Sequence, residues 1–141
     1  MDFGLISSTF KTLRIAPSSK LTLLEAQSLT SAHYPPFPPD MPALLMGIDS
    51  IELALQIKKV LLAVYPKGHE VTIVEGQRSK VEQLGDFQPL SFTFQPSTCL
   101  YLPPLGEGTS FEAFAEIVAH LRAPDGCPWD QKQTHQTLRT H

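Results

Sequence analysis

The segment from Ala43 to Val74 constrains the fold more than any other part of the chain. It opens with a continuously apolar run, Ala43 to Ile48, typical of a strand covered on both faces of a sheet. A helical pattern follows from Ser50 to Val64, and the β-branched run from Glu70 to Val74 predicts a second strand. Strand, helix and strand in this order predict a right-handed crossover between parallel neighbours. We therefore expect an α/β protein with a mixed sheet.

Weaker signals flank this segment. Apolar side chains at roughly helical spacing predict a helix from Phe3 to Ile15, and the short apolar run Leu21 to Leu24 fits either element type. The proline-rich string Tyr34 to Asp40 is a stiff connector, because proline lacks the backbone donor that a helix or central strand needs. The remaining predictions are a turn over Gly76 to Lys80, an outer strand within Val81 to Leu90, and a further strand over Thr98 to Leu102.

The pattern changes at the proline- and glycine-rich string Leu102 to Gly108, which predicts a boundary between a first domain, residues 1–105, and a helical segment, residues 106–141. An amphipathic stripe then predicts a helix, and its members are Phe111, Phe114, Ala115, Ile117, Val118 and Leu121. Three acid- or hydroxyl-led pairs predict helix starts: Asp49 with Glu52, Thr109 with Glu112, and Asp130 with Gln133. An apolar face of this size is expected to be covered, so the stripe folds back on the α/β part or pairs with a second chain; otherwise it stays mobile.

Charge, apolar content and cysteine count bear on the partners and the cellular compartment of the chain. The net charge is −3 and there is no run rich in Lys and Arg, which argues against nucleic acid or an anionic membrane as partner. No apolar run approaches the length needed to cross a bilayer. Cys99 and Cys127 are the only cysteines, and the start of the chain lacks the pattern of a secretion signal, so we expect a reduced, cytoplasmic protein.

The string Gly126 to Arg139, GCPWDQKQTHQTLR, resembles the opening of MazG-type nucleoside triphosphate pyrophosphohydrolases. That family opens with an amphipathic helix, then a turn and helix reading G-C-P-W-D-x-x-Q-T-H-x-S-L; Thr137 stands in the serine position here. The resemblance implies nucleoside triphosphate substrates and Mg²⁺ held by an E-E-x-x-E pattern and a later E-x-x-D on following helices. Those acidic positions are absent from this chain, so we expect it to have no hydrolase activity by itself.

The middle of the chain, roughly Gly4 to Leu105, resembles the C-terminal lobe of tetrapyrrole methylases in the form fused ahead of MazG domains. The resemblance rests on PALLMGIDS, on the Y-P-x-x-H-x-V-T-x-V pattern from Tyr65 to Val74, and on the ending LYLPPL. It implies S-adenosylmethionine as cofactor, although the family's glycine-rich cofactor loop is not present in this chain. We therefore expect a piece of a longer fused protein, cut at both ends, which binds neither cofactor tightly.

Seven residues are candidate site residues, and each also has a plainer reading. Met46 and Gly47 fall near the cofactor in the methylase family, or Met46 is a core side chain at a strand end. Glu75 and Gly76 end a strand where α/β proteins place ligands, or they form a turn. Candidates for nucleotide contact are Trp129, Asp130 and Gln133, but a tryptophan after a turn also packs between helices, and Asp130 also fits a helix cap. His120, His135 and Cys127 match no zinc spacing, so no metal site and no catalytic residue is expected.

The function expected from these resemblances is that of a fragment of a methylase and pyrophosphohydrolase fusion protein. Its partners would be a small nucleotide or tetrapyrrole substrate and, through the helical segment, a second copy of the chain. Two alternatives stay open. The chain is a complete, non-catalytic α/β binding or assembly module, or only the MazG resemblance is meaningful and the front part is a regulatory domain.

Overall fold

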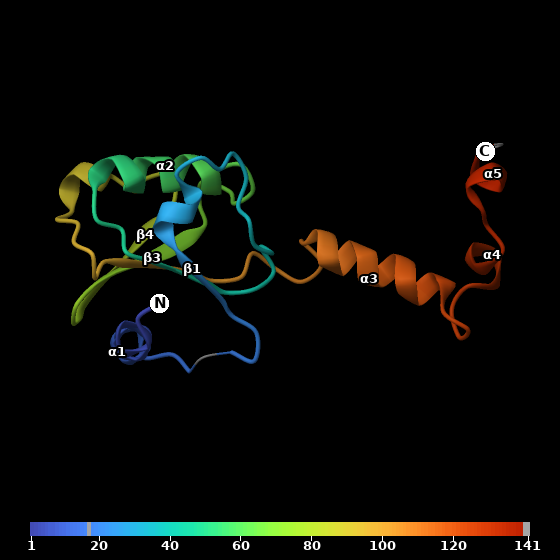
Figure 1. Cartoon of the computed structure of the whole chain (residues 1–141), viewed down its shortest axis with the longest axis horizontal. Helices are drawn as coiled ribbons and strands as arrows, with labels where there is room; N and C mark the ends of the chain where they lie inside the picture. Colours follow the sequence, from blue (N-terminus) through green and yellow to red (C-terminus); the bar gives the residue numbers. More distant parts are fainter. Residues whose placement is uncertain (17, 140–141) are drawn as a thin grey trace.

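A five-stranded mixed sheet with helices on both faces forms the body of the molecule, in a computed structural model that describes residues 1–16 and 18–139 (Figure 1). The α/β expectation is thereby confirmed. The helices are α1 (Phe3–Leu13), α2 (Ile51–Leu61), α3 (Phe111–Arg122), α4 (Pro128–Gln131) and α5 (His135–Leu138), with 3₁₀ turns η1 (Ala26–Leu29) and η2 (Pro89–Ser91). The strands are β1 (Thr22–Glu25), β2 (Ala43–Met46), β3 (Glu70–Glu75), β4 (Arg78–Gln83) and β5 (Cys99–Leu102).

The strand order is β1-β2-β5-β3-β4, which corrects one sequence prediction. β2 and β3 run in the same direction but are not neighbours, because β5 lies between them and pairs antiparallel with both. Cys99, for example, is opposite Met46 on one side and Val74 on the other. The only parallel pair in the described part of the sheet is β1 with β2. The short sequence of β5 carries no sign of which strands it will separate, so the crossover rule alone misplaced it.

Each sheet face has its own apolar cluster, as the period-two alternation of strand side chains requires. Leu45, Ile73 and Leu100 lie on the face covered by α2, together with the helix residues Ile57 and Leu61. On the opposite face, Leu44, Met46, Val74 and Cys99 pack with Phe10 of α1. All four residues of β2 are buried, which confirms the reading of that run as a strand covered on both faces.

The helix caps fall one residue later than the sequence pairs suggested. Ser50, not Asp49, caps α2 by accepting a hydrogen bond from the Leu53 amide at 3.2 Å. Ser110, not Thr109, caps α3 in the same way, with the Ala113 amide at 3.0 Å. In both cases a serine follows the predicted cap directly, and its short hydroxyl reaches the third amide of the helix. The pattern located both helices but not the residue that caps them.

The hairpin between β3 and β4 is tighter than expected. The predicted turn over Gly76 to Lys80 is wrong, because β4 already begins at Arg78 and only Gly76 and Gln77 lie between the strands. Gly76 has a φ of 61° while Gln77 is not among the residues with positive φ, which is the type II′ pattern with glycine first. That turn matches the right-handed twist of the strands and lets them pair along their full lengths.

Helix α3 extends away from the sheet and carries α4 and α5 at its far end (Figure 1). It covers the predicted residues 111–122, and none of its side chains is buried. Its attachment to the body is local: the Ser110 hydroxyl donates to Asp40 at 2.6 Å, and Phe111 lies against Tyr34 with ring centroids 6.3 Å apart. Within the described residues, the apolar stripe therefore does not fold back on the α/β part.

Candidate functional site

The carboxyl ends of β1, β2 and β3 lie at one edge of the sheet, and two predicted pairs are found there. Met46 is opposite Glu25 of β1 and Cys99 of β5, while Val74, one residue before Glu75, is opposite Cys99 as well. The antiparallel β5 between them does not change this, because β2 and β3 still point the same way. The topology therefore brings Met46–Gly47 and Glu75–Gly76 to a common edge.

Helix α1 packs on one face of the sheet and reaches both pairs. Leu5, near its start, lines a hollow of about 170 Å³ together with Met46 and Gly47. Near its end, the Thr12 hydroxyl donates to the Gly76 carbonyl at 3.1 Å. Between these points Phe10 packs into the cluster that contains Met46. The helix therefore lies beside both pairs that the sequence assigned to a cofactor.

Met46 serves both readings that the sequence left open. Its side chain is 4% exposed and belongs to the apolar cluster under α1, as a core methionine would. It also lines the 170 Å³ hollow, whose lining includes Asp2, Glu25, Gln27 and Met1, whose N-terminal ammonium lies 3.8 Å from Glu25 Oε1. Gly47 adopts a φ of 76° and donates its amide to the Thr98 carbonyl at 3.1 Å. That backbone conformation favours glycine, so the residue is required by the bend after β2 whether or not a ligand binds.

Glu75 and Gly76 do not share the hollow at Met46. Gly76 is the turn residue of the hairpin described above. The Glu75 side chain lines a different cavity of about 330 Å³ with Ile73, which belongs to the cluster under α2. The two predicted cofactor pairs therefore lie at one edge but face opposite sides of the sheet.

The three predicted nucleotide contacts lie on the separate helical segment. Trp129 is 57% exposed in α4, so it is not packed between helices. Asp130 does not cap a helix, because Cys127 precedes α4 and Asp130 lies inside its first turn. Gln133 accepts a hydrogen bond from the Thr137 hydroxyl at 2.9 Å and donates to the Trp129 carbonyl at 3.3 Å. The structure brings these three residues together at one turn, away from Met46 and Glu75 (Figure 1).

Arg122 and Gly126 fix this turn; the sequence placed Gly126 in a turn but assigned Arg122 no role. One guanidinium nitrogen of Arg122 donates to the carbonyls of Asp130 and Gln133, at 2.9 and 3.2 Å. Gly126 lies so close to the last turn of α3 that a Cβ there would collide with the carbonyl oxygens of His120 and Leu121. The glycine of the GCPWD string is therefore required by packing on α3, which the Pro-Asp-Gly sequence of the turn does not reveal.

Two absences apply to the part of the chain that the structure describes. No three His, Cys, Asp or Glu side chains among these residues are grouped so that they could hold a metal ion. None of the described helices combines the length and the apolar character that a membrane crossing requires.

The fold and these sites define the class of the molecule as a mixed α/β protein with an appended, exposed helical segment. The chain is similar to YabN of Bacillus subtilis, an uncharacterized protein, with 28% identity over 150 aligned positions that cover 96% of this chain and 29% of YabN. It is also similar to the nucleoside triphosphate pyrophosphohydrolase/pyrophosphatase MazG of Thermotoga maritima, with 47% identity over 34 residues, 24% of this chain and 13% of that protein. The matched part of the chain covers less than a third of the length of either relative. No family model matches the chain.

Proposed function

We propose that this chain contributes to a protein of nucleotide metabolism related to MazG-type pyrophosphohydrolases, and that α3 to α5 are the contributing segment. The single observation that carries the proposal is the 34-residue stretch with 47% identity to the Thermotoga protein. We infer that this stretch is the helical segment, since the GCPWD string lies there at the turn that Gly126 and Arg122 hold.

In this proposal Trp129 stacks on the nucleobase, while Asp130 and Gln133 line the same site. Trp129 is suited to the role because its ring is exposed and its backbone is held by the Gln133 side chain. Base stacking on an aromatic side chain contributes about 1–3 kcal/mol. The triphosphate and its Mg²⁺ need several carboxylates, and the chain contains no E-E-x-x-E pattern. The proposed role of this segment is therefore base binding, not hydrolysis.

The test uses the fact that Trp129 is the only tryptophan, so its fluorescence reports on this site alone. Nucleoside triphosphates with Mg²⁺ are expected to quench the emission saturably, whereas inorganic pyrophosphate leaves it unchanged. No release of pyrophosphate is expected in the same mixtures. Emission that no nucleotide of a broad panel alters, in a folded chain, would contradict the proposed site. Magnesium-dependent pyrophosphate release at enzyme-like rates would contradict the division between base binding and hydrolysis.

We propose in addition that a second copy of the chain covers the apolar stripe of α3. The five large side chains of the stripe are exposed, from 37% for Leu121 to 74% for Phe111. Burying an apolar stripe of this kind is favourable, and an antiparallel or parallel pairing of the α3 helices of two copies would bury it. Sedimentation velocity at several concentrations is the direct measurement.

A methylase-like origin of the α/β part is a finer proposal, supported by the strings quoted above and by the position of Met46 and Gly47 beside a hollow. That hollow, at about 170 Å³, is smaller than the roughly 300–1,000 Å³ typical of ligand sites. S-adenosylmethionine is therefore expected to bind weakly to this chain, or not at all. Calorimetry with the full chain measures this, and tight stoichiometric binding would contradict the expectation.

A further inference from the structure

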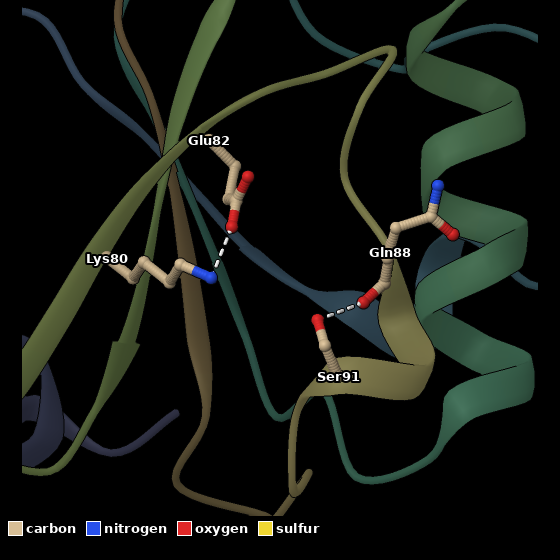
Figure 2. A network of polar contacts seen from close by, with 4 residues as sticks. All are labelled: Lys80, Glu82, Gln88 and Ser91. Carbon is tan, nitrogen blue, oxygen red and sulfur yellow. Dashed lines mark hydrogen bonds and ion pairs between the residues drawn. The ribbon is translucent and has the colours of Figure 1, made fainter.

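The cavity beside the β3–β4 hairpin contains charged groups that the proposed function does not use. Its volume is about 330 Å³, and it opens on the α2 side of the sheet between β4 and the η2 turn. Six of its lining residues carry the argument: Ile73, Glu75, Arg78, Lys80, Ser91 and Phe92. Figure 2 shows Lys80 and Glu82 on β4 facing the turn that carries Gln88 and Ser91.

Two opposite charges in this cavity lack partners. The Oε1 atom of Glu75 is buried and has no hydrogen-bond partner. Arg78 is directly opposite Glu75 in the strand register, yet its guanidinium makes no hydrogen bond or ion pair with any residue that the structure describes. A buried carboxylate oxygen without a donor is costly, and a bound donor would remove that cost.

Lys80 and Ser91, two other polar residues of the cavity, already have partners. Lys80 Nζ lies 2.6 Å from Glu82 Oε1, and the same ammonium lies 5.2 Å from the centre of the Phe92 ring. The Ser91 hydroxyl donates to the Gln88 carbonyl at 2.7 Å. The Lys80–Glu82 pair is neutral as a unit, so the charges left over are one carboxylate, Glu75, and one guanidinium, Arg78.

From this arrangement we propose that the cavity binds a small α-amino acid with an apolar side chain. The carboxylate of the ligand would pair with Arg78, whose planar fork suits a carboxylate. Its ammonium would donate to Glu75, and its side chain would lie against Ile73 and Phe92. A zwitterion fits better than a simple anion or cation, because the unpaired charges of the site sum to zero.

The probe is L-leucine, titrated to about 50 mM while backbone amide signals are followed by NMR, since an open site for so small a ligand is expected to bind at millimolar concentration. Saturable shifts are expected at residues 73–80 and 91–92. Two analogues each lack one charge: 3-methylbutylamine has no carboxylate, and 4-methylpentanoate has no ammonium. Both are expected to bind at least about tenfold more weakly, the effect of one lost charge-assisted hydrogen bond.

Four variants separate the proposed contacts from general effects. Arg78→Gln and Glu75→Gln are each expected to weaken leucine binding about tenfold or more, while Lys59→Gln on α2 and Glu116→Gln on α3 leave it unchanged. A thermal melt of each variant establishes that it is folded. The proposal is overturned if leucine gives no saturable shifts, if either analogue binds as well as leucine, or if S-adenosylmethionine binds at these residues and leucine does not. The nucleotide site on α4 is elsewhere in the chain, so its failure would leave this result unaffected.

Discussion

Replacing Gly126 by alanine tests whether the turn after α3 is built as described. An alanine Cβ would collide with the carbonyl oxygens of His120 and Leu121, which are backbone atoms that cannot rotate away. Relief requires the turn to move off α3, and overpacking of this kind costs about 1–3 kcal/mol. The hydrogen bond from the Cys127 amide to the Leu121 carbonyl, 2.9 Å long, is lost first.

That cost is comparable to the free energy that holds the turn on α3. Two backbone hydrogen bonds, at Gly126 and Cys127, and the two from Arg122 fasten it to α3. Each contributes about 0.5–1.5 kcal/mol net. The sheet shares few contacts with this segment, so the thermal midpoint of the α/β part is expected to stay the same. The variant should therefore open the turn locally.

Trp129 emission and hydrogen exchange of residues 123–133 measure the opening. In Gly126→Ala the emission should shift toward that of free tryptophan, and exchange in this range should quicken about 5-fold to 150-fold, the equivalent of 1–3 kcal/mol. Gly68→Ala is the matched control, because a Cβ at Gly68 meets nothing within 4 Å. Unchanged exchange and emission in Gly126→Ala would refute the close packing of Gly126 on α3.

Three further predictions concern the cap of α3, a buried tyrosine and the apolar stripe. Ser110→Ala removes the cap on the Ala113 amide and the bond to Asp40, so the first turn of α3 should lose about 0.5–2 kcal/mol and exchange faster; unaltered exchange there would argue against the cap. Burial raises the pKa of Tyr65 from 10.0 to about 12, so the folded state keeps this proton at a pH where the unfolded state releases it. The free energy of unfolding should therefore fall by about 2–3 kcal/mol as pH rises from about 10 to 12. Tyr65→Phe should remove that loss in denaturant titrations at the two pH values, and an equal loss in the variant would contradict it. Ile117→Asp places a charge in the exposed stripe and should convert a dimer to a monomer in sedimentation velocity; an unchanged sedimentation coefficient would count against pairing through α3.

The fold was predictable where a local pattern decides it. The continuous apolar run of β2 and the helical stripe from Phe111 identified elements that the structure contains, since burial on both faces or on one face leaves a clear period in the sequence. The position of β5 between β2 and β3 was not predictable, because strand order depends on pairing between distant segments. The hairpin turn was missed for a different reason: Gly76–Gln77 is less distinctive than Asn-Gly or Gly-Gly.

The candidate sites show the same difference between what local sequence and what long-range pairing determine. Trp129, Asp130 and Gln133 lie together at one turn because they are close along the chain, and their role in nucleotide binding stays a prediction. The sequence also named Met46 and Glu75 together, and the sheet does bring both to one edge. The two side chains face opposite sides of the sheet because of the strand register. A shift of one strand by a single residue would turn its side chains to the other face. The unpaired Glu75 and Arg78 could be found only from the register and the side-chain positions.

The central place of β5 has a consequence for how the molecule is made. Because β5 pairs with both β2 and β3 and follows every other strand that the structure describes, the two halves of the sheet stay unjoined until Leu102 has been synthesised. Until then the inner edges of β2 and β3 present unsatisfied backbone groups to other nascent chains. Contacts between such distant segments also form slowly. Aggregation during synthesis should therefore be most severe for ribosome-bound chains that end before β5, and should fall once it has emerged.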